Sequence, residues 1–398
     1  MTPTLPTAVA DQFTDADRKF LIELRRSLHR RPELSWQERQ TQQRLREALL
    51  DVGITDITAI ADTGLVARIP GVNPDGPAVA LRGDIDALPI QEASGQPWTS
   101  MHEGVMHACG HDMHAAWTVG AGLLLARQPA LGEVRLFLQP AEEVGEGAAR
   151  MIAEGALEGV GAIFGGHVDW RYSVGELVAT AGALAASTDT FEIVFTGRGG
   201  HGARPQDTLD PIVGMAAFVS DVQTIVSRRL DPALPGVISV GQFEAGSAPN
   251  VIPETARCTG TIRATTPGSR ALLCEELERL AHAVATAHRL TAEVKLSEGT
   301  PPLLNGLRAA AWAQDAAAAL LGAESLHTLP VANMGGEDFA FYTERVEGCF
   351  MRIGTWREGR PRAGVHTPRF DPDEDALFVA AAILAECART ASRALRGG

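Results

Sequence analysis

The segment MHACGHDMH, residues 106–114, places three imidazoles, one thiol and one carboxylate within nine consecutive positions. It runs into an apolar stretch, residues 115–126, that has the composition of a buried helix. A single glycine separates Cys109 from His111, so both side chains can point inward from a tight turn. Thiolate and imidazole are the ligands that zinc and similar divalent metals prefer. The segment therefore indicates a metal site, with a buried cysteine and core histidines as the alternative when it is considered alone.

Carboxylates follow two apolar segments that have the composition of strands. Residues 79–82 lead within four positions to Asp86, and residues 133–138 are followed by the pair Glu142 and Glu143. Adjacent side chains on an extended backbone point to opposite sides, so one glutamate can bind a metal while the other faces substrate or water. If each segment is considered alone, the alternative for Asp86 is an ordinary Asp-rich turn, and the alternative for Glu142 and Glu143 is a solvated pair on the surface. The position of these carboxylates after apolar strands favours a site at one edge of an α/β sheet.

A third apolar segment, residues 162–164, leads to His167 and is expected to bring another ligand to the same edge of the sheet. Helical periodicity predicts an N-terminal helix over residues 15–31. Ser35 and Glu38 have the spacing of a capping box, which predicts that they open a second helix ending at Gly53. After residue 298 the same type of pattern resumes, with helices at 307–321 and 376–395 around a buried strand at 349–353.

Residues 184–297 have a different pattern, in which strand, helix, strand, strand, helix and strand follow one another. The predicted strands and helices are 188–195, 211–228, 237–243, 259–263, 272–288 and 292–296. We therefore predict an α/β protein with two domains. Residues 1–183 and 298–398 form a metal-binding domain with a mixed sheet flanked by helices. Residues 184–297 form an inserted ferredoxin-like α+β domain.

Composition excludes some classes of partner. The formal net charge of −14 over 398 residues argues against nucleic acid or an anionic membrane as the partner. No apolar run approaches the roughly 18 residues that span a bilayer, and the N-terminus lacks the pattern of a signal peptide. The five cysteines are scattered, which is typical of a reducing compartment. These features predict a cytoplasmic protein.

Ten motifs in one order make the chain resemble a known family. They are HRRPELSWQE, RGDIDALPI, MHACGHDMH, LQPAEE, GGHV, GRGGHGARP, APNVIP, GTIRA, GGEDFAFY and HTPRF. The chain resembles the M20 family of metallopeptidases and aminoacylases, and within it the amidohydrolase branch that includes hippurate hydrolases and plant auxin-conjugate hydrolases. The chain departs from the family pattern in two places. It has Asp169-Trp170 after GGHV, where the family often has a proline, and it has Gln206 near a position where the family often has a histidine. These departures leave the preference for the acyl group and for the amino-acid side chain open.

The resemblance implies a role for each matching residue. Glu142 is the general base and acid, and His201 on the insertion reaches an active site, in many family members that of the partner subunit. Asp86 supports the metal site from behind its ligands. The implied ligands of two metal ions are Cys109, His111, Glu143, His167 and His366. The implied substrate-binding residues are Asn250 and Arg263, which hold a carboxylate, and Gly335 and Gly336, which line the same pocket. His107 and His114 are interpreted as packing or supporting groups and not as ligands.

Together these roles predict an amidohydrolase that depends on two divalent ions, with zinc, manganese or cobalt as candidates. It would release a carboxylic acid and a free amino acid from a small N-acyl amino acid. Residues 1–183 and 298–398 would then be the catalytic domain, and residues 184–297 a lid and dimerisation domain. A homodimer is the expected assembly, with a tetramer as a further possibility. A dipeptidase of the same family is the nearest alternative enzyme. A catalytically silent metal- or peptide-binding protein on this fold is the alternative from another class.

Overall fold

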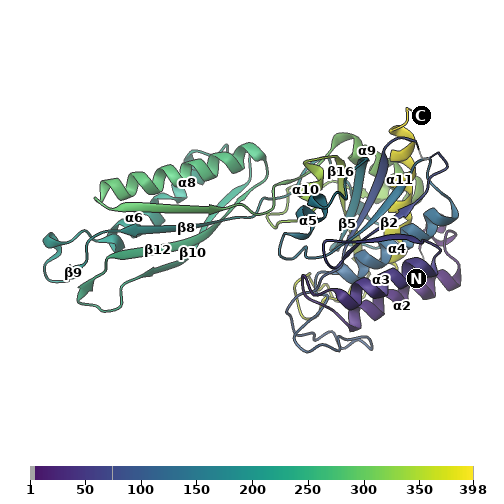
Figure 1. Ribbon diagram of the computed structural model, residues 1–398, viewed down its shortest axis with the longest axis horizontal. Helices are drawn as coiled ribbons and strands as arrows, with labels where there is room; N and C mark the ends of the chain where they lie inside the picture. The colour runs from purple at the N-terminus through teal and green to yellow at the C-terminus, as the bar shows by residue number, and fades with distance from the viewer. Residues whose placement is uncertain (1–4, 74, 398) are drawn as a thin grey trace. The chain divides into compact units, whose positions relative to one another are not determined.

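The computed structural model describes residues 5–73 and 75–397, and the chain divides into two compact units (Figure 1). The first unit contains the chain up to Gly182, the segment Leu304–Pro330 and the chain from Asp338 onward. The second contains Ala183–Leu303 and the short segment Val331–Glu337. This short segment lies outside the predicted insertion. Its backbone joins the second unit, because the Asn333 N–H donates to the Leu184 carbonyl at 2.9 Å.

The first unit is built on a mixed sheet of eight strands within the described residues, in the order β1-β2-β4-β3-β5-β16-β6-β15. The strands are β1 (Asp56–Ile60), β2 (Gly64–Ile69), β3 (Ala78–Asp84), β4 (Val134–Gln139), β5 (Val160–Ser173), β6 (Leu177–Val178), β15 (Leu326–His327) and β16 (Glu347–Trp356). The four central strands β4, β3, β5 and β16 are parallel, whereas β1, β2 and β4 pair antiparallel. The predicted α/β class with a mixed sheet is confirmed.

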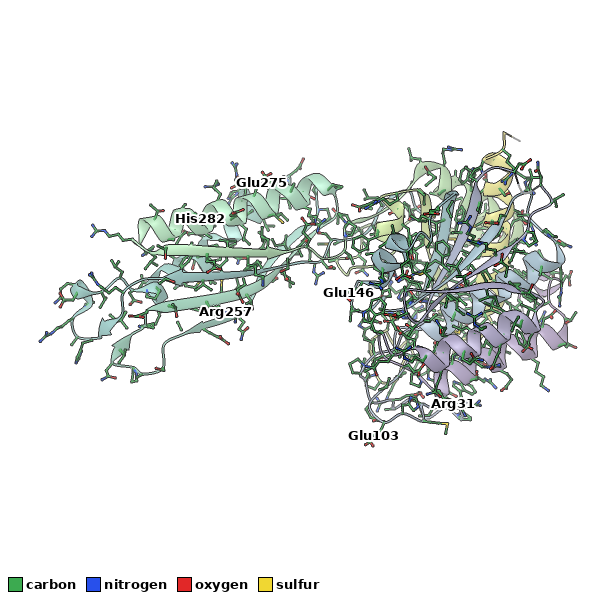
Figure 2. All side chains as sticks on the ribbon, viewed as in Figure 1. Arg31, Glu103, Glu146, Arg257, Glu275 and His282 are labelled. Atoms are coloured by element: carbon green, nitrogen blue, oxygen red, sulfur yellow. The ribbon has the colours of Figure 1, made fainter. Side chains whose placement is uncertain are left out.

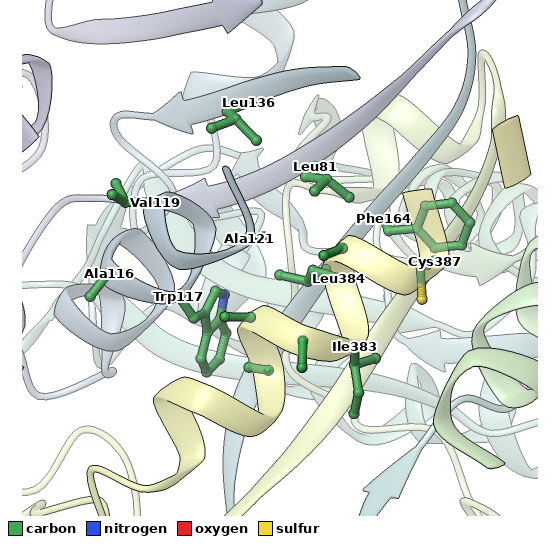
Figure 3. Close-up of a cluster of buried hydrophobic side chains, with 14 of the residues drawn as sticks. Leu81, Ala116, Trp117, Val119, Ala121, Leu136, Phe164, Ile383, Leu384 and Cys387 are labelled. Carbon is green, nitrogen blue, oxygen red and sulfur yellow. The ribbon is translucent and has the colours of Figure 1, made fainter. Parts of the chain in front are cut away.

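Helices flank this sheet (Figure 1). They are α1 (Thr7–Ala10), α2 (Asp15–Arg30), α3 (Arg39–Asp51), α4 (His111–Arg127), α5 (Gly147–Ala153), α9 (Leu307–Leu321), α10 (Ala340–Thr343) and α11 (Ala376–Ala394). Helix α4 is buried along nearly its whole length because it is apolar on every side, as expected for a helix enclosed by other layers. In Figure 3, Trp117 and Ala121 of α4 lie in one cluster with Ile383 of α11, and Leu81 and Leu136 of the sheet belong to the same core.

Three local predictions differ from the structure. Helix α4 begins at His111, four residues earlier than predicted, because Gly110 adopts a left-handed backbone with φ 88° and caps it. Strand β5 continues to Ser173, so His167 lies inside a strand and not at its end. The capping-box prediction is wrong: α3 begins after Glu38, and the Glu38 side chain makes no capping hydrogen bond. The first amide groups of α3 are instead bound by the Glu33 carboxylate.

The second unit contains a four-stranded antiparallel sheet in the order β10-β12-β8-β13. Its strands are β8 (Asp189–Thr196), β10 (Gly236–Ala245), β12 (Thr255–Ala264) and β13 (Thr291–Ser297), and its helices are α6 (Pro211–Asp221), α7 (Gln223–Arg228) and α8 (Pro267–Ala287). The predicted succession of strands and helices is present, although the predicted helix 211–228 is divided into α6 and α7. Shorter pairs join β7 (Gly182–Ala185) to β14 (Leu303–Asn305) and β9 (Gly200–His201) to β11 (Val251–Ile252).

Alternation along the strands gives this second sheet one apolar and one polar face. Phe191, Ile193 and Phe195 of β8 are buried in a core shared with α6 and α8. The opposite face carries charged side chains, such as Arg257, which forms an ion pair with Glu192. Figure 2 shows Arg257 on the sheet and Glu275 and His282 on α8; both α8 residues are exposed. In the described part of the chain, no helix has the length and apolar character needed to cross a membrane.

Candidate metal centre

Five side chains from four parts of the first unit converge at one point. Cys109 Sγ lies 3.2 Å from His167 Nε2 and 3.2 Å from His366 Nε2. Glu143 Oε1 lies 3.5 Å from His366 Nε2 and 3.8 Å from His111 Nε2. The five residues that the family pattern marks as metal ligands therefore lie together.

Local structure explains how these residues reach each other. Gly110 turns the chain between Cys109 and His111, and a Cβ at this glycine would lie only 2.7 Å from Val168 Cγ2. His366 has a left-handed backbone with φ 61°, and its N–H donates to the Ala108 carbonyl at 2.8 Å. The two segments are more than 250 residues apart in sequence, and this backbone bond fixes His366 beside Cys109.

Hydrogen bonds to Nδ1 orient two of the imidazoles so that Nε2 points into the cluster. His167 Nδ1 donates to the Val168 carbonyl at 2.8 Å, which leaves the lone pair of a neutral ring on Nε2. Burial, with smaller effects of His114 and Arg352, lowers the pKa of His167 well below its usual value, so this ring is neutral. His111 Nδ1 faces Asp86 Oδ1 at 3.1 Å, and its Nε2 likewise points into the cluster.

The donor set fits divalent cations. His111 Nε2 and Glu143 Oε1 are buried and have no hydrogen-bond partner among the described residues, which is costly unless a cation satisfies them. Burial disfavours a charged His111, but the carboxylates of Asp84, Asp86 and Glu143 outweigh it and raise its pKa to about 10. The same excess of negative charge attracts a metal. Cys109 belongs to two overlapping groups of three ligands, one with His111 and His167 and one with Glu143 and His366. These two groups of side chains would hold two divalent ions.

Asp86 lies next to the cluster and accepts hydrogen bonds from two of its five residues, His111 and Glu143. Its Oδ1 accepts from His111 Nδ1 at 3.1 Å, and its Oδ2 accepts from the Glu143 N–H at 3.0 Å and from Ser35 Oγ at 2.7 Å. Although the carboxylate is buried, which raises its pKa, these hydrogen bonds and the charge of His111 lower the pKa of Asp86 overall. One carboxylate therefore orients an imidazole ligand and fixes the backbone of a carboxylate ligand.

His114 has no nitrogen to spare for a metal. Its Nδ1 lies 2.5 Å from Asp84 Oδ1, and its Nε2 accepts from the Val168 N–H at 3.0 Å. His107 is buried, and burial lowers its pKa to about 4; neither ring nitrogen has a hydrogen-bond partner among the described residues. Within the part of the chain that the structure describes, neither ring shares a ligand cluster with Cys109, although His114 forms a group of three with Asp84 and His111.

A buried network beneath the cluster escaped the sequence analysis. Arg82, which is completely buried, pairs with Asp84, donates to Gln139 Oε1 at 2.8 Å and lies 2.8 Å from Asp338 Oδ1. Asp338 also accepts from Gln139 Nε2 and from the Ala148 N–H. The network ties the ends of β3 and β4 together, next to Asp86 and Glu143. An arginine inside the apolar strand 78–84 was the available signal, because a buried charge requires partners.

Among the other family-pattern residues, Glu142 lies in the first unit beside the cluster, with its Oε2 3.9 Å from His111 Nε2. The rest lie in the second unit, at its two ends. His201 pairs with Val251 in the short β9–β11 ladder, where the Gly202 N–H donates to the Asn250 carbonyl at 2.8 Å. His201 Nδ1 accepts from the Ala203 N–H at 3.1 Å, so the neutral ring carries its proton on Nε2. His201 is exposed, which leaves Nε2 accessible as a donor.

Arg263 and the two glycines lie at the other end of the second unit. Arg263 pairs with Val237 near the end of β12, and the neighbouring Ala264 carbonyl accepts from the Ser187 N–H at 2.8 Å. The Gly335 carbonyl accepts from the Ala186 N–H at 3.1 Å, one residue away. A Cβ on Gly336 would lie 2.2 Å from Thr188 Cγ2, so only glycine fits there.

Comparison with known proteins gives the family. The sequence profile described as Peptidase family M20/M25/M40 matches residues 80–390, which is most of the chain. The chain belongs to peptidase family M20/M25/M40. The resemblance inferred from the ten motifs is thus confirmed, and as a member of this family the chain is a hydrolase.

Relatives within the M20/M25/M40 family match almost end to end. An N-acetylcysteine deacetylase of Bacillus subtilis strain 168 is 40% identical over 383 residues, covering 94% of this chain and 98% of the relative. The IAA-amino acid hydrolase ILR1-like 2 of Arabidopsis thaliana is 38% identical over 376 residues, covering 93% and 84%. The crystal structure of the B. subtilis YXEP protein, described as a dinuclear metal binding peptidase from the M20 family, matches with a TM-score of 0.83 and 37% identity, covering 94% and 98%.

Proposed function

We propose that this protein hydrolyses the amide bond of N-acyl-L-amino acids with two divalent ions, releasing a carboxylic acid and a free amino acid. The observation that carries the proposal is the convergence of Cys109, His111, Glu143, His167 and His366, with ligand atoms 3.2–3.8 Å apart. Two ions held there would supply a water of lowered pKa and polarise the scissile carbonyl. The names of the relatives, a deacetylase of N-acetylcysteine and a hydrolase of IAA-amino acids, support an acyl group on an amino acid nitrogen.

Glu142 is assigned the proton transfers. Its Oε2 lies 3.9 Å from His111 Nε2, next to the ligand cluster, whereas the adjacent Glu143 contacts two ligands. A carboxylate in this position can accept a proton from the attacking water and deliver it to the leaving nitrogen. Amide hydrolysis needs both transfers, because an unprotonated amine is a poor leaving group.

Substrate recognition is assigned to the second unit. The Nε2–H of His201 is available to stabilise the developing oxyanion of the substrate carbonyl. Arg263, with its planar guanidinium, can bind an α-carboxylate through two hydrogen bonds, with Asn250 and the backbone of Gly335 and Gly336 as further contacts. These assignments favour a substrate that has a free carboxylate, and they imply a homodimer if both ends of the second unit serve one site.

A matched substrate panel tests the proposal. The metal-supplemented protein should hydrolyse N-acetyl and N-benzoyl amino acids faster than the corresponding dipeptides and faster than the same N-acyl compounds with an amidated carboxylate. A preference for dipeptides would favour the dipeptidase alternative. Absence of turnover on every member, with zinc, manganese and cobalt each supplied in turn, would favour a silent binding protein. The Glu142→Ala variant is the control for background metal-catalysed hydrolysis.

A further inference from the structure

Backbone strain in the first unit is concentrated around one buried side chain. The non-glycine residues with a left-handed backbone in the described chain are Trp36, Ala61, Asp62, Ala141, Arg289 and His366. The first four of these lie near Glu38 or near its two hydrogen-bond partners, Thr63 and Ala141. Trp36 is two positions before Glu38, Ala61 and Asp62 directly precede Thr63, and Ala141 is itself a partner. For residues other than glycine this conformation costs free energy, and it persists only where the surroundings impose it.

Glu38 is the side chain at the centre. It is fully buried, its Oε2 accepts from Thr63 Oγ1 at 2.6 Å, and its Oε1 accepts from the Ala141 N–H at 2.9 Å. Thr63 directly follows Ala61 and Asp62 in the chain. Because the side chain caps no helix, helix formation does not explain a buried carboxylate here, and burial of an acidic group is unfavourable without a compensating role.

The bond to Ala141 acts on the catalytic turn. Ala141 has φ 55° and immediately precedes Glu142 and Glu143. Its carbonyl accepts from the Gly147 N–H at 3.2 Å, and the Glu142 carbonyl accepts from the Gly145 N–H at 2.7 Å, so the left-handed alanine opens a closed turn. The direction in which both glutamates leave the backbone depends on this conformation.

We propose that Glu38 is a positioning residue that holds Ala141 in its left-handed conformation and thereby aims Glu142 and Glu143 into the metal centre. The catalytic part of this inference rests on the proposed function of Glu142, whereas the effect on Glu143 does not. Without Glu38 the Ala141 N–H would be buried and unpaired, so the turn would gain by leaving the strained conformation. Displacing a general base by about 1 Å is enough to cost about 10²-fold in rate.

The test compares three variants with the wild-type protein. Glu38→Ala removes the acceptor. Glu38→Gln keeps it, because the amide oxygen can accept from Ala141 while the NH₂ donates to Thr63 Oγ1. Thr63→Val is the matched control, because it removes the other hydrogen bond of the same carboxylate and leaves the bond to Ala141 intact. Each variant is measured for amide hydrogen exchange in residues 138–147, for Mn²⁺ affinity by titration calorimetry, and for kcat.

We expect Glu38→Ala to accelerate exchange in residues 138–147, to weaken Mn²⁺ binding by about 10–100-fold and to lower kcat by about 10²-fold or more. Glu38→Gln and Thr63→Val should retain wild-type exchange in this segment, wild-type Mn²⁺ affinity and wild-type kcat. Adding Ala141→Gly to Glu38→Ala should recover most of the lost affinity, because glycine adopts the left-handed conformation without strain. If Glu38→Ala does not fold, Glu38→Asp, whose shorter side chain cannot reach Ala141, takes its place.

Exchange and Mn²⁺ affinity do not depend on the substrate, so they decide the inference even if no N-acyl amino acid is hydrolysed. A folded Glu38→Ala protein with wild-type exchange and Mn²⁺ affinity would overturn it. So would equal losses in Glu38→Ala and Thr63→Val, because those would indicate a general effect on stability. A folded Glu38→Gln protein that has lost affinity would also overturn it, since the charge would then matter and not the hydrogen bond to Ala141.

Discussion

Replacing Asp86 by asparagine should weaken metal binding with almost no change in the shape of the site. The carboxylate accepts hydrogen bonds on both oxygens: from His111 on Oδ1, and from the Glu143 N–H and Ser35 Oγ on Oδ2. An amide has one acceptor oxygen. If that oxygen takes the Oδ2 position with its two donors, the NH₂ group faces His111 Nδ1. The imidazole must then accept at Nδ1 and carry its proton on Nε2, which removes the lone pair that a metal requires.

The size of the effect follows from this change of tautomer. Loss of the partner that orients a histidine ligand lowers metal affinity by about 10–100-fold. This range corresponds to about 1.4–2.7 kcal/mol of binding free energy. The opposite orientation of the amide keeps the hydrogen bond to His111 but turns the amide NH₂ towards the Glu143 N–H, so that two donors face each other. Asp86 is only 1% exposed. Burial leaves no water to relieve either arrangement, so we expect a loss within this range whichever orientation the amide adopts.

Titration calorimetry with Mn²⁺ and Zn²⁺ on metal-stripped protein measures the loss, and ¹⁵N chemical shifts of the histidine rings report the tautomer. Ser35→Ala is the matched control, because it removes one hydrogen bond to Oδ2 and leaves those to His111 and Glu143. It should bind metal almost as well as the wild-type protein. An Asp86→Asn protein with wild-type metal affinity would refute the role assigned to Asp86.

Glu142→Ala should retain both metals yet lose at least about 10²–10⁴-fold in kcat, and loss of metal in parallel analysis would contradict its role as base. Burial and the adjacent glutamates raise the pKa of the Cys109 thiol, and that of His111 is about 10, so metal binding must displace protons. Affinity should therefore rise with pH through the neutral range, and calorimetry in buffers of different ionisation enthalpy should detect proton release; pH-independent binding would argue against these ligands. His201→Ala and Glu142→Ala subunits, dissociated and reassembled together, should recover up to about a quarter of wild-type activity, and inactive mixed dimers would exclude a shared site.

The fold was predictable because periodicity reports local structure. The alternation of Phe191, Ile193 and Phe195 predicts a strand with one buried face, which the structure contains. The apolar stretch 115–126 predicts a buried helix for a different reason, because it is apolar on every side. The boundaries were less predictable, because they depend on contacts between distant segments. Helix α4 starts at His111 since Gly110 can adopt a left-handed backbone against Val168, and no local pattern includes that neighbour.

The candidate site was predictable where chemistry marks residues and not where packing does. Cysteine and histidine close together indicate a metal site, and the five implied ligands do converge. Ser35 and Glu38 show the opposite case, because their spacing fits a helix cap and both side chains bind elsewhere. Ser35 donates to Asp86, 51 residues away, and Glu38 accepts from Ala141, 103 residues away. A local rule cannot anticipate a partner at that separation, and a competing tertiary hydrogen bond outweighs the cap.

The geometry of the second unit argues for a site shared between chains. Arg263 is eight residues from Thr255, where β12 meets the last residue of β8, Thr196. At about 3.3 Å per residue this length is about 26 Å, and His201 lies beyond that end, in the β9–β11 ladder (Figure 1). An N-acyl amino acid is far shorter than this span, so one chain cannot hold the substrate carboxylate with Arg263 and the substrate carbonyl with His201. If both contribute to one reaction, each comes from a different chain, and a two-fold dimer supplies both contacts at two equivalent sites. If His201→Ala and Glu142→Ala subunits form mixed dimers that remain inactive, the site is not shared between chains. Only one of the two residues Arg263 and His201 can then contribute to substrate binding.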